Sequence, residues 1–165
     1  MMKFLVDAML GKLARLLRIL GFNTVYAADL RDFYQTNPVP DEKLIDYAEN
    51  HKRIIITKDL PLHNAYKKMS IYLNGEGTYI YLAQLKKKLT LDFNFEIQKA
   101  RCSICNLKLK KVKDKYLIKD IVPNDTFSHY DDFYQCINPQ CKKLYWQGSH
   151  IEDIKNRLNH ILKTE

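Results

Sequence analysis

The chain has 165 residues, of which 46% are hydrophobic, enough for one ordinary core and a small second module. Its 27 Lys and Arg against 19 Asp and Glu give a formal charge of +8, which favours a polyanionic partner, RNA or DNA before an acidic membrane surface. No apolar stretch approaches the roughly 20 residues that cross a bilayer, and Asp7 interrupts the N-terminal apolar run too early for a signal peptide. We therefore expect a soluble, cytoplasmic protein that does not bind membranes.

The first half of the chain alternates predicted strands and helices. Short apolar or β-branched runs typical of buried strands cover residues 3–6, 24–26, 53–57 and 70–73. Helical spacing of apolar residues predicts helices over residues 10–20, 41–51, 62–69 and 82–89. Gly21 ends the first helix, and polar and proline residues predict an exposed loop over 32–40. This alternation predicts an α/β fold with a parallel sheet covered on both faces, whose ligands bind beyond the carboxyl ends of the strands.

The second half has a different pattern. Periodicity weakens over residues 90–100, so we predict one domain over residues 1–95 and a second over residues 96–165. The second domain holds short β-like runs between two cysteine pairs. A terminal amphipathic helix follows, marked by the apolar residues Ile151, Ile154, Leu158, Ile161 and Leu162. This apolar stripe would also suit a subunit that docks on another protein.

Four cysteines form two close pairs, Cys102-Ser-Ile-Cys105 and Cys136-Ile-Asn-Pro-Gln-Cys141. Each pair can present two thiolates to one tetrahedral ion at about 2.3 Å, as in four-cysteine zinc ribbons. A redox C-x-x-C motif and unrelated buried thiols are the alternatives. Two clustered pairs in one short segment favour a single structural Zn²⁺.

Three carboxylates stand at places that meet along one edge of a parallel sheet. Asp7 and Asp59 follow strands, and Asp41 opens a helix. Clustered carboxylates repel, so they stay ionised together only when a cation such as Mg²⁺ or Mn²⁺ neutralises them. Such an ion can activate water to attack a phosphodiester, which is nuclease chemistry.

Simpler interpretations exist for several of these charged residues. Asp41, which follows Pro40, and Asp59 are both suited to cap a helix. Glu42 is near enough to Asp41 to assist it. Basic residues close to Asp7 are candidates for contacts with a nucleic-acid backbone, although they also suit a solvated helix face: Lys12, Arg15 and Arg18.

Several segments resemble the Mut-seven C-terminal RNase family, in which a zinc ribbon follows a PIN-like nuclease domain. In the first half they are FLVDAMLGKLARLLRILGF over residues 4–22, Asp41-Glu-Lys-Leu44 and Arg53-Ile-Ile-Ile-Thr-Lys-Asp59. In the second half they include Arg101-Cys-Ser-Ile-Cys-Asn106 and Tyr145-Trp-Gln-Gly-Ser-His150. The resemblance covers nearly the whole chain.

The resemblance implies a PIN-like parallel sheet flanked by helices, then a small β-rich four-cysteine zinc ribbon and a terminal helix. It also implies metal-dependent cleavage of RNA, with Asp7, Asp41 and Asp59 at the acidic positions. A fourth acid is expected near the end of a later strand, where Glu76 is the candidate. Lys58 stands where similar sequences have arginine, and it is a candidate RNA contact. A non-catalytic RNA-binding or ribosome-associated protein with a vestigial acidic site is the alternative.

Overall fold

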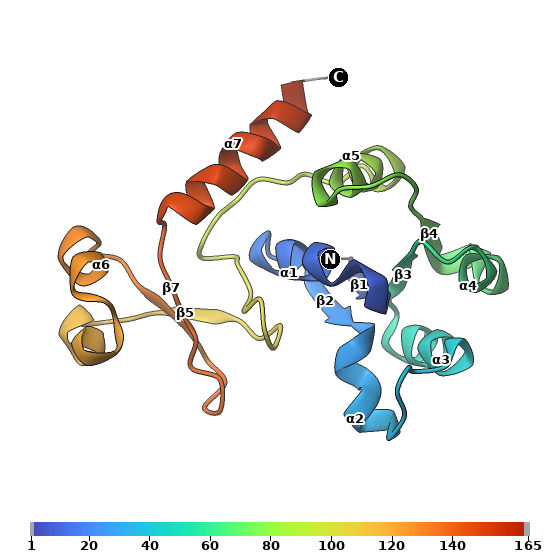
Figure 1. Cartoon of the computed structure of the whole chain (residues 1–165), viewed down its shortest axis with the longest axis horizontal. Coiled ribbons are helices and arrows are strands. Elements are labelled where there is room, and N and C mark those ends of the chain that lie inside the picture. The colour runs from blue at the N-terminus through green and yellow to red at the C-terminus, as the bar shows by residue number, and fades with distance from the viewer. Residues whose placement is uncertain (1, 164–165) are drawn as a thin grey trace.

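Four short strands build a parallel sheet in the computed structural model, which describes residues 2–163, with side chains as far as Ile161. The strands are β1 Lys3–Val6, β2 Asn23–Tyr26, β3 Ile54–Thr57 and β4 Ser70–Tyr72. They lie in the order β2-β1-β3-β4, and every neighbouring pair is parallel (Figure 1). The predicted parallel sheet is therefore confirmed, with β1 and β3 at its centre.

Helices cover both faces of this sheet. They are η1 Ala8–Leu10, α1 Gly11–Ile19, η2 Ala27–Leu30, α2 Arg31–Tyr34, α3 Asp41–His51, α4 Leu60–Ala65, η3 Lys67–Met69, α5 Thr78–Leu89 and the terminal α7 Ser149–Lys163. On one face α1, α5 and α7 share a core, in which Leu17 and Leu82 are fully buried. On the other face α3 and α4 pack through Leu44 and Leu62. The predicted α/β fold is confirmed.

Local chain geometry explains how the helix bounds differ from the predicted ones. Gly21 ends α1 as expected, with a φ of +93°, and a Cβ there would meet the carbonyl oxygen of Lys99 at 2.9 Å. The helix predicted over residues 62–69 is interrupted at Tyr66, whose φ of −136° is not helical. The last helix of the first half begins at Thr78 rather than at residue 82, directly after Gly77.

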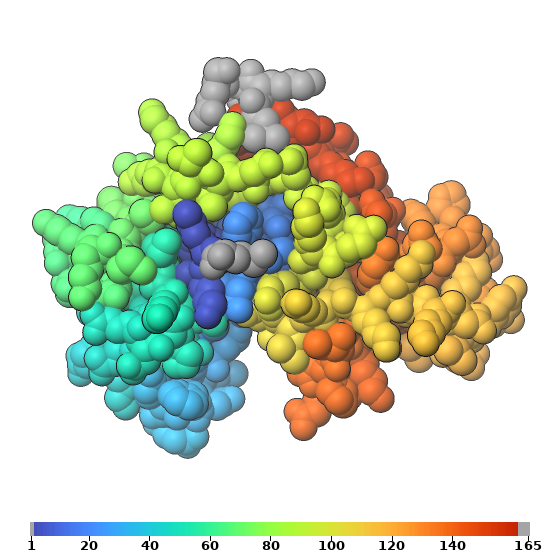
Figure 2. Space-filling model, turned by 180° about the vertical axis from the view of Figure 1, so that it is seen from behind, coloured from blue at the N-terminus to red at the C-terminus, as the bar shows by residue number. Residues whose placement is uncertain are grey.

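A small antiparallel sheet forms in the second half. Its strands are β5 Leu109–Lys111, β6 Tyr134–Cys136 and β7 Leu144–Tyr145, in the order β5-β6-β7. Between β5 and β6 lie the 3-10 helix η4 Lys115–Ile121 and the helix α6 Asn124–His129. In the space-filling view this sheet and its helices form one end of the molecule, and α3 and α4 lie toward the other (Figure 2). No helix among residues 2–163 is long and apolar enough to span a membrane.

The connecting segment and the terminal helix pack on the first half. Leu91 and Phe93 of the connection are buried in the core beside α1 and α5. Ile151, Ile154 and Leu158 of α7 join the same core, while the side chain of Leu162 lies outside the described residues. The chain's own core therefore covers Ile151, Ile154 and Leu158, so this part of the stripe is not available to dock on another protein. The division at residues 95 and 96 stays a prediction.

Arg18 of α1 ties the two halves together. Its side chain is only 4% exposed, and Nε donates to the carbonyl oxygen of Thr24 at 2.8 Å. Nη1 donates to the carbonyl oxygens of Ser103 and Ile104 at 3.0 and 2.8 Å, and Nη2 pairs with Asp29 at 3.0 Å. The guanidinium of Arg18 is therefore not free to contact RNA, which corrects the sequence-based prediction for this residue.

Replacing Arg18 should destabilise the whole chain. Arg18→Met keeps most of the buried stem but leaves three carbonyl oxygens without their donor, so we expect a loss of about 2–4 kcal/mol. Urea unfolding measures this loss. The matched control is Arg15→Met, an exposed residue of the same helix, which should change stability by less than about 0.5 kcal/mol. Equal unfolding midpoints for the two variants would contradict the structural role of Arg18.

Candidate functional site

The carboxyl edge of the central strands carries the candidate active site. Asp7 directly follows β1, and its backbone N–H donates to the carbonyl oxygen of Ile56 in β3 at 2.9 Å. Asp59 lies two residues beyond the end of β3, and Asp41 is the first residue of α3. The neighbouring strands thus bring Asp7 and Asp59 to one edge of the sheet.

Thr57 joins Asp7 to the segment that carries Asp59. The Thr57 hydroxyl donates to Oδ2 of Asp7 at 2.6 Å and accepts from the backbone N–H of Asp59 at 2.8 Å. Thr57 is fully buried, and Asp7 also accepts from the backbone N–H of Ala8 at 2.6 Å. These bonds hold the Asp7 carboxylate in one orientation. Sequence reasoning missed Thr57, although its hydroxyl closes an otherwise aliphatic strand.

The two capping interpretations have different outcomes. Oδ1 of Asp59 accepts from the backbone N–H of Leu62 at 2.9 Å, so Asp59 caps α4 as that alternative predicts. Asp41 does not cap α3, because Pro40 occupies the N-cap position and no side chain caps that helix. Within residues 2–163 the Asp41 carboxylate has no hydrogen-bond or ion-pair partner.

Asp41 faces the other carboxylates of the edge. Burial raises the pKa of Asp41, and the negative charges of Asp59, Asp7 and Glu42 raise it further. Asp59, Asp7 and Glu42 are therefore close enough to Asp41 for their charges to act on it. The group is looser than a ready metal cage, because among the described residues only the four cysteines bring their ligand atoms together closely enough to hold a metal ion. The catalytic roles of these acids stay a prediction.

Lys58 and Glu76 form an ion pair beside this edge. Lys58 Nζ lies 2.5 Å from Oε1 of Glu76 and 5.6 Å from the ring centroid of Tyr81. Hydrogen bonds to Glu76 and Tyr81 raise the pKa of Lys58, and the Lys58 ammonium lowers the pKa of Glu76. Glu76 therefore pairs with the Lys58 ammonium in this structure and does not add a fourth carboxylate to the group around Asp41.

A basic pocket of about 570 Å³ opens next to the start of α1. Lys12 and Arg15 line it together with Glu76, and the rings of Tyr26 and Tyr81 form part of its wall. Both Lys12 and Arg15 are exposed. Two of the three basic residues that the sequence places near Asp7 thus remain available to a ligand.

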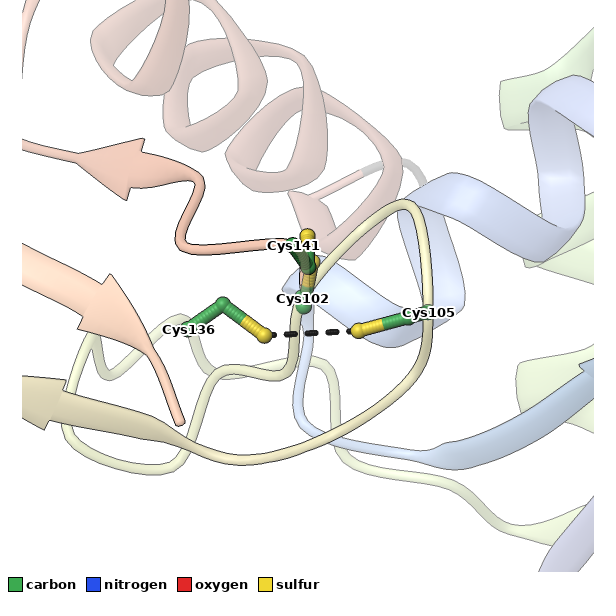
Figure 3. A group of neighbouring side chains, drawn as sticks. All are labelled: Cys102, Cys105, Cys136 and Cys141. Atoms are coloured by element: carbon green, nitrogen blue, oxygen red, sulfur yellow. Dashed lines mark hydrogen bonds between the residues drawn. The ribbon is translucent and has the colours of Figure 1, made fainter. Parts of the chain in front are cut away.

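The four cysteines converge in the second half (Figure 3). The sulfur atoms of Cys102 and Cys141 lie 3.6 Å apart, those of Cys105 and Cys136 lie 3.3 Å apart, and all four lie within 4.8 Å of one another. All four are free thiols. Four thiolates around one Zn²⁺ at about 2.3 Å would be roughly 3.8 Å apart, so the cluster has the dimensions of a metal site.

The protein environment distinguishes the thiols. Burial raises the pKa of the Cys136 and Cys141 thiols. Burial also raises the pKa of Cys102, but hydrogen bonds from the Tyr145 hydroxyl and from backbone N–H groups outweigh it and lower that pKa to about 7. The Tyr145 hydroxyl lies 3.2 Å from the Cys102 sulfur. The Tyr145 hydroxyl therefore stabilises the thiolate form of Cys102, which is the form that binds a metal.

Comparison with known protein families assigns the chain. A model of the Mut7-C RNAse domain matches residues 2–158, nearly the whole chain. The chain belongs to the Mut7-C RNAse domain family. No curated protein and no solved structure gives a significant match. The Mut7-C match includes both the carboxylate edge and the cysteine cluster, and it confirms the resemblance seen in the sequence.

Asp41 should make stability depend on pH. Because folding raises the pKa of Asp41, the folded chain holds this proton more tightly, and stability falls as pH rises through that pKa. Asp41→Asn should therefore gain stability relative to wild type between pH 3 and pH 7 when no divalent cation is present. Urea midpoints across this range measure the effect. Asp46→Asn, which removes a carboxylate from the same helix away from the carboxylate edge, serves as the comparison, and parallel curves for Asp41→Asn and wild type would refute the prediction.

Proposed function

We propose that this chain is a metal-dependent ribonuclease that hydrolyses RNA phosphodiester bonds at a PIN-like acidic site. The observation that carries the proposal is the placement of Asp7 and Asp59 at the carboxyl edge of β1 and β3, near enough to Asp41 for their charges to raise its pKa, beside a basic pocket. Repelling carboxylates suit a divalent cation with oxygen ligands, Mg²⁺ or Mn²⁺. Membership of the Mut7-C RNAse domain family indicates a nuclease-like role and supports RNA as the substrate.

Each residue of the edge has a role in this proposal. Asp7, Asp41 and Asp59 hold the cation, and Glu42 assists Asp41. The bound cation supplies charge stabilisation at the phosphodiester and lowers the pKa of water. The Thr57 hydroxyl orients Asp7, so that its carboxylate is set before a ligand arrives. Unlike the arginine of similar sequences, Lys58 presents a point charge to a phosphate, and Glu76 orients it.

RNA would approach over the basic pocket. Lys12 and Arg15 are exposed there and can neutralise backbone phosphates, which bind proteins without regard to sequence. Arg18 is left out of this set because its guanidinium serves the fold. The formal charge of +8 supports the same partner through long-range attraction.

The cysteine cluster is proposed to hold one structural Zn²⁺. Sulfur ligands in two pairs suit Zn²⁺, and a closed set of four leaves no position for a substrate. Four free thiols also suit the reducing cytoplasm, where we propose that the protein acts.

A non-catalytic RNA-binding or ribosome-associated role is the second candidate. Two observations favour it: Asp59 is engaged as a helix cap, and Glu76 is engaged by Lys58. The carboxylate group would then be vestigial, and the basic surface alone would bind RNA. A cleavage assay separates the two functions.

Cleavage should require the carboxylate edge. Incubation of single-stranded and structured RNA with Mn²⁺ or Mg²⁺ should give products, and Asp7→Asn should slow cleavage by about a hundredfold or more, since it removes a proposed metal ligand. Asp32→Asn, an exposed carboxylate on α2, is the control and should cleave at the wild-type rate. Equal rates for Asp7→Asn and wild type would refute the site, and RNA binding without any cleavage would favour the second candidate.

Metal analysis tests the cysteine cluster separately. The purified protein should contain about one equivalent of zinc, and Cys141→Ser should lower that content because it removes one of four ligands. Chelation should unfold the second half first, which amide exchange can follow residue by residue. Ser103→Ala, a change between Cys102 and Cys105 that removes no sulfur ligand, is the control and should keep its zinc. A metal-free protein with a fully protected second half would overturn this proposal.

A further inference from the structure

The insertion between the cysteine pairs is larger than metal binding requires. It contains η4 and α6 and has a small core of its own around Ile118, Val122 and Phe133. A four-cysteine site needs only that its two pairs be brought together, which β5, β6 and β7 already do. The insertion lies at the end of the molecule away from α3 and α4 (Figure 2). Metal binding therefore does not explain why the insertion has a core of its own.

One side of the insertion forms a groove of about 730 Å³ between η4, β5 and the turn at residues 137–142. Three aliphatic side chains in its wall face solvent: Leu117 is 78% exposed, Ile121 64% and Ile137 50%. Solitary exposed apolar residues are ordinary, but several that share one groove mark a binding surface. We therefore call the surface lined by Leu117, Ile121 and Ile137 the insertion groove.

The wall of the insertion groove is held in place from behind. Lys115 Nζ donates to the carbonyl oxygens of Phe127 and Tyr130 at 3.1 and 3.2 Å, and it pairs with Asp131 at 2.7 Å. Tyr116 contacts the ring of Phe127 edge-on. These contacts fix η4 with Leu117 pointing outward. A preformed groove loses less conformational entropy when it binds.

The rim of the insertion groove is basic. Lys110, Lys111, Lys113 and Lys142 line it, and no carboxylate does. Lys111 pairs with Asp132 at 2.7 Å. The other three lysines form no salt bridge within residues 2–163. Lys110, Lys113 and Lys142 thus place uncompensated positive charge around the aliphatic residues of the groove wall.

We propose that the insertion groove binds a segment of another protein in which leucine-like side chains alternate with Asp and Glu. The partner's aliphatic side chains would pack on the aliphatic wall of the groove, and its carboxylates would pair with Lys110, Lys113 and Lys142. The lining contains no aromatic ring, whereas surfaces that bind single-stranded RNA stack bases on aromatic side chains. A second copy of this chain, itself at +8, is repelled by the same charge. The proposal does not depend on RNA cleavage.

Selection from a displayed library of random peptides tests the chemistry. The immobilised full-length protein should enrich sequences of about 12 residues, roughly 18 Å long as a helix, that combine aliphatic residues with Asp or Glu. An enriched peptide is then labelled, and its affinity is measured by fluorescence anisotropy. Failure to enrich acidic aliphatic sequences overturns the proposal.

Two pairs of variants locate the binding. Leu117→Ser with Ile137→Ser, and separately Lys113→Glu with Lys142→Glu, should each weaken peptide binding by about tenfold or more. The matched controls are Leu107→Ser and Lys119→Glu, exposed residues of the second half outside the groove lining, which should bind as wild type does. Unchanged peptide affinity in both groove variants overturns the proposal.

RNA is the competing occupant, and oligouridylate is its probe. Loss of oligouridylate affinity in Leu117→Ser with Ile137→Ser, equal to the loss of peptide affinity, would assign the groove to RNA and overturn the proposal. Unchanged oligouridylate affinity in that variant supports it. The groove variants should cleave RNA as wild type does. Because peptide binding is measured without RNA, it can be interpreted even when the ribonuclease proposal fails.

Discussion

The buried guanidinium of Arg18 is the constraint on which the rest of the structure depends. Strand β2 lies at an open edge of the parallel sheet, and a buried cation beside it is tolerated because four oxygen atoms surround it. Asn106 strengthens the same junction, since its Oδ1 accepts from the backbone N–H of Thr24 at 3.0 Å. The segment around the first cysteine pair therefore packs beside β2 and connects the two halves of the chain.

The carboxylate edge shows the opposite balance. Parallel topology places the ends of β1 and β3 side by side, so like charges gather there whatever they cost in stability. Thr57 offsets part of that cost by donating to Asp7, and Lys58 pairs with Glu76 nearby. Hydrogen bonds from Thr57 and Ala8 thus hold Asp7 in one orientation, as expected where function requires fixed charges.

Local patterns explain which features could be predicted from sequence. The run Ile54–Thr57 and the spacing of the cysteines depend on neighbours along the chain, so the strand and the four-thiol cluster were both predictable. The role of Arg18 was not, because its acceptor Ser103 lies 85 residues away. Helical periodicity likewise identified α7 but not the core that it joins. The pairing of Glu76 with Lys58 also depends on tertiary placement rather than on sequence pattern.

The structure shows that the basic residues behind the net charge lie in different environments. A charge of +8 suggested a single polyanionic partner, yet the basic residues serve three environments. Arg18 is consumed by the fold, Lys12 and Arg15 line the pocket beside the carboxylate edge, and a separate lysine rim surrounds an aliphatic groove in the insertion. Aromatic or carboxylate neighbours suit nucleic acid and metal, whereas aliphatic neighbours suit protein side chains. The surroundings of each cation, and not the total charge, therefore determine which partner it fits.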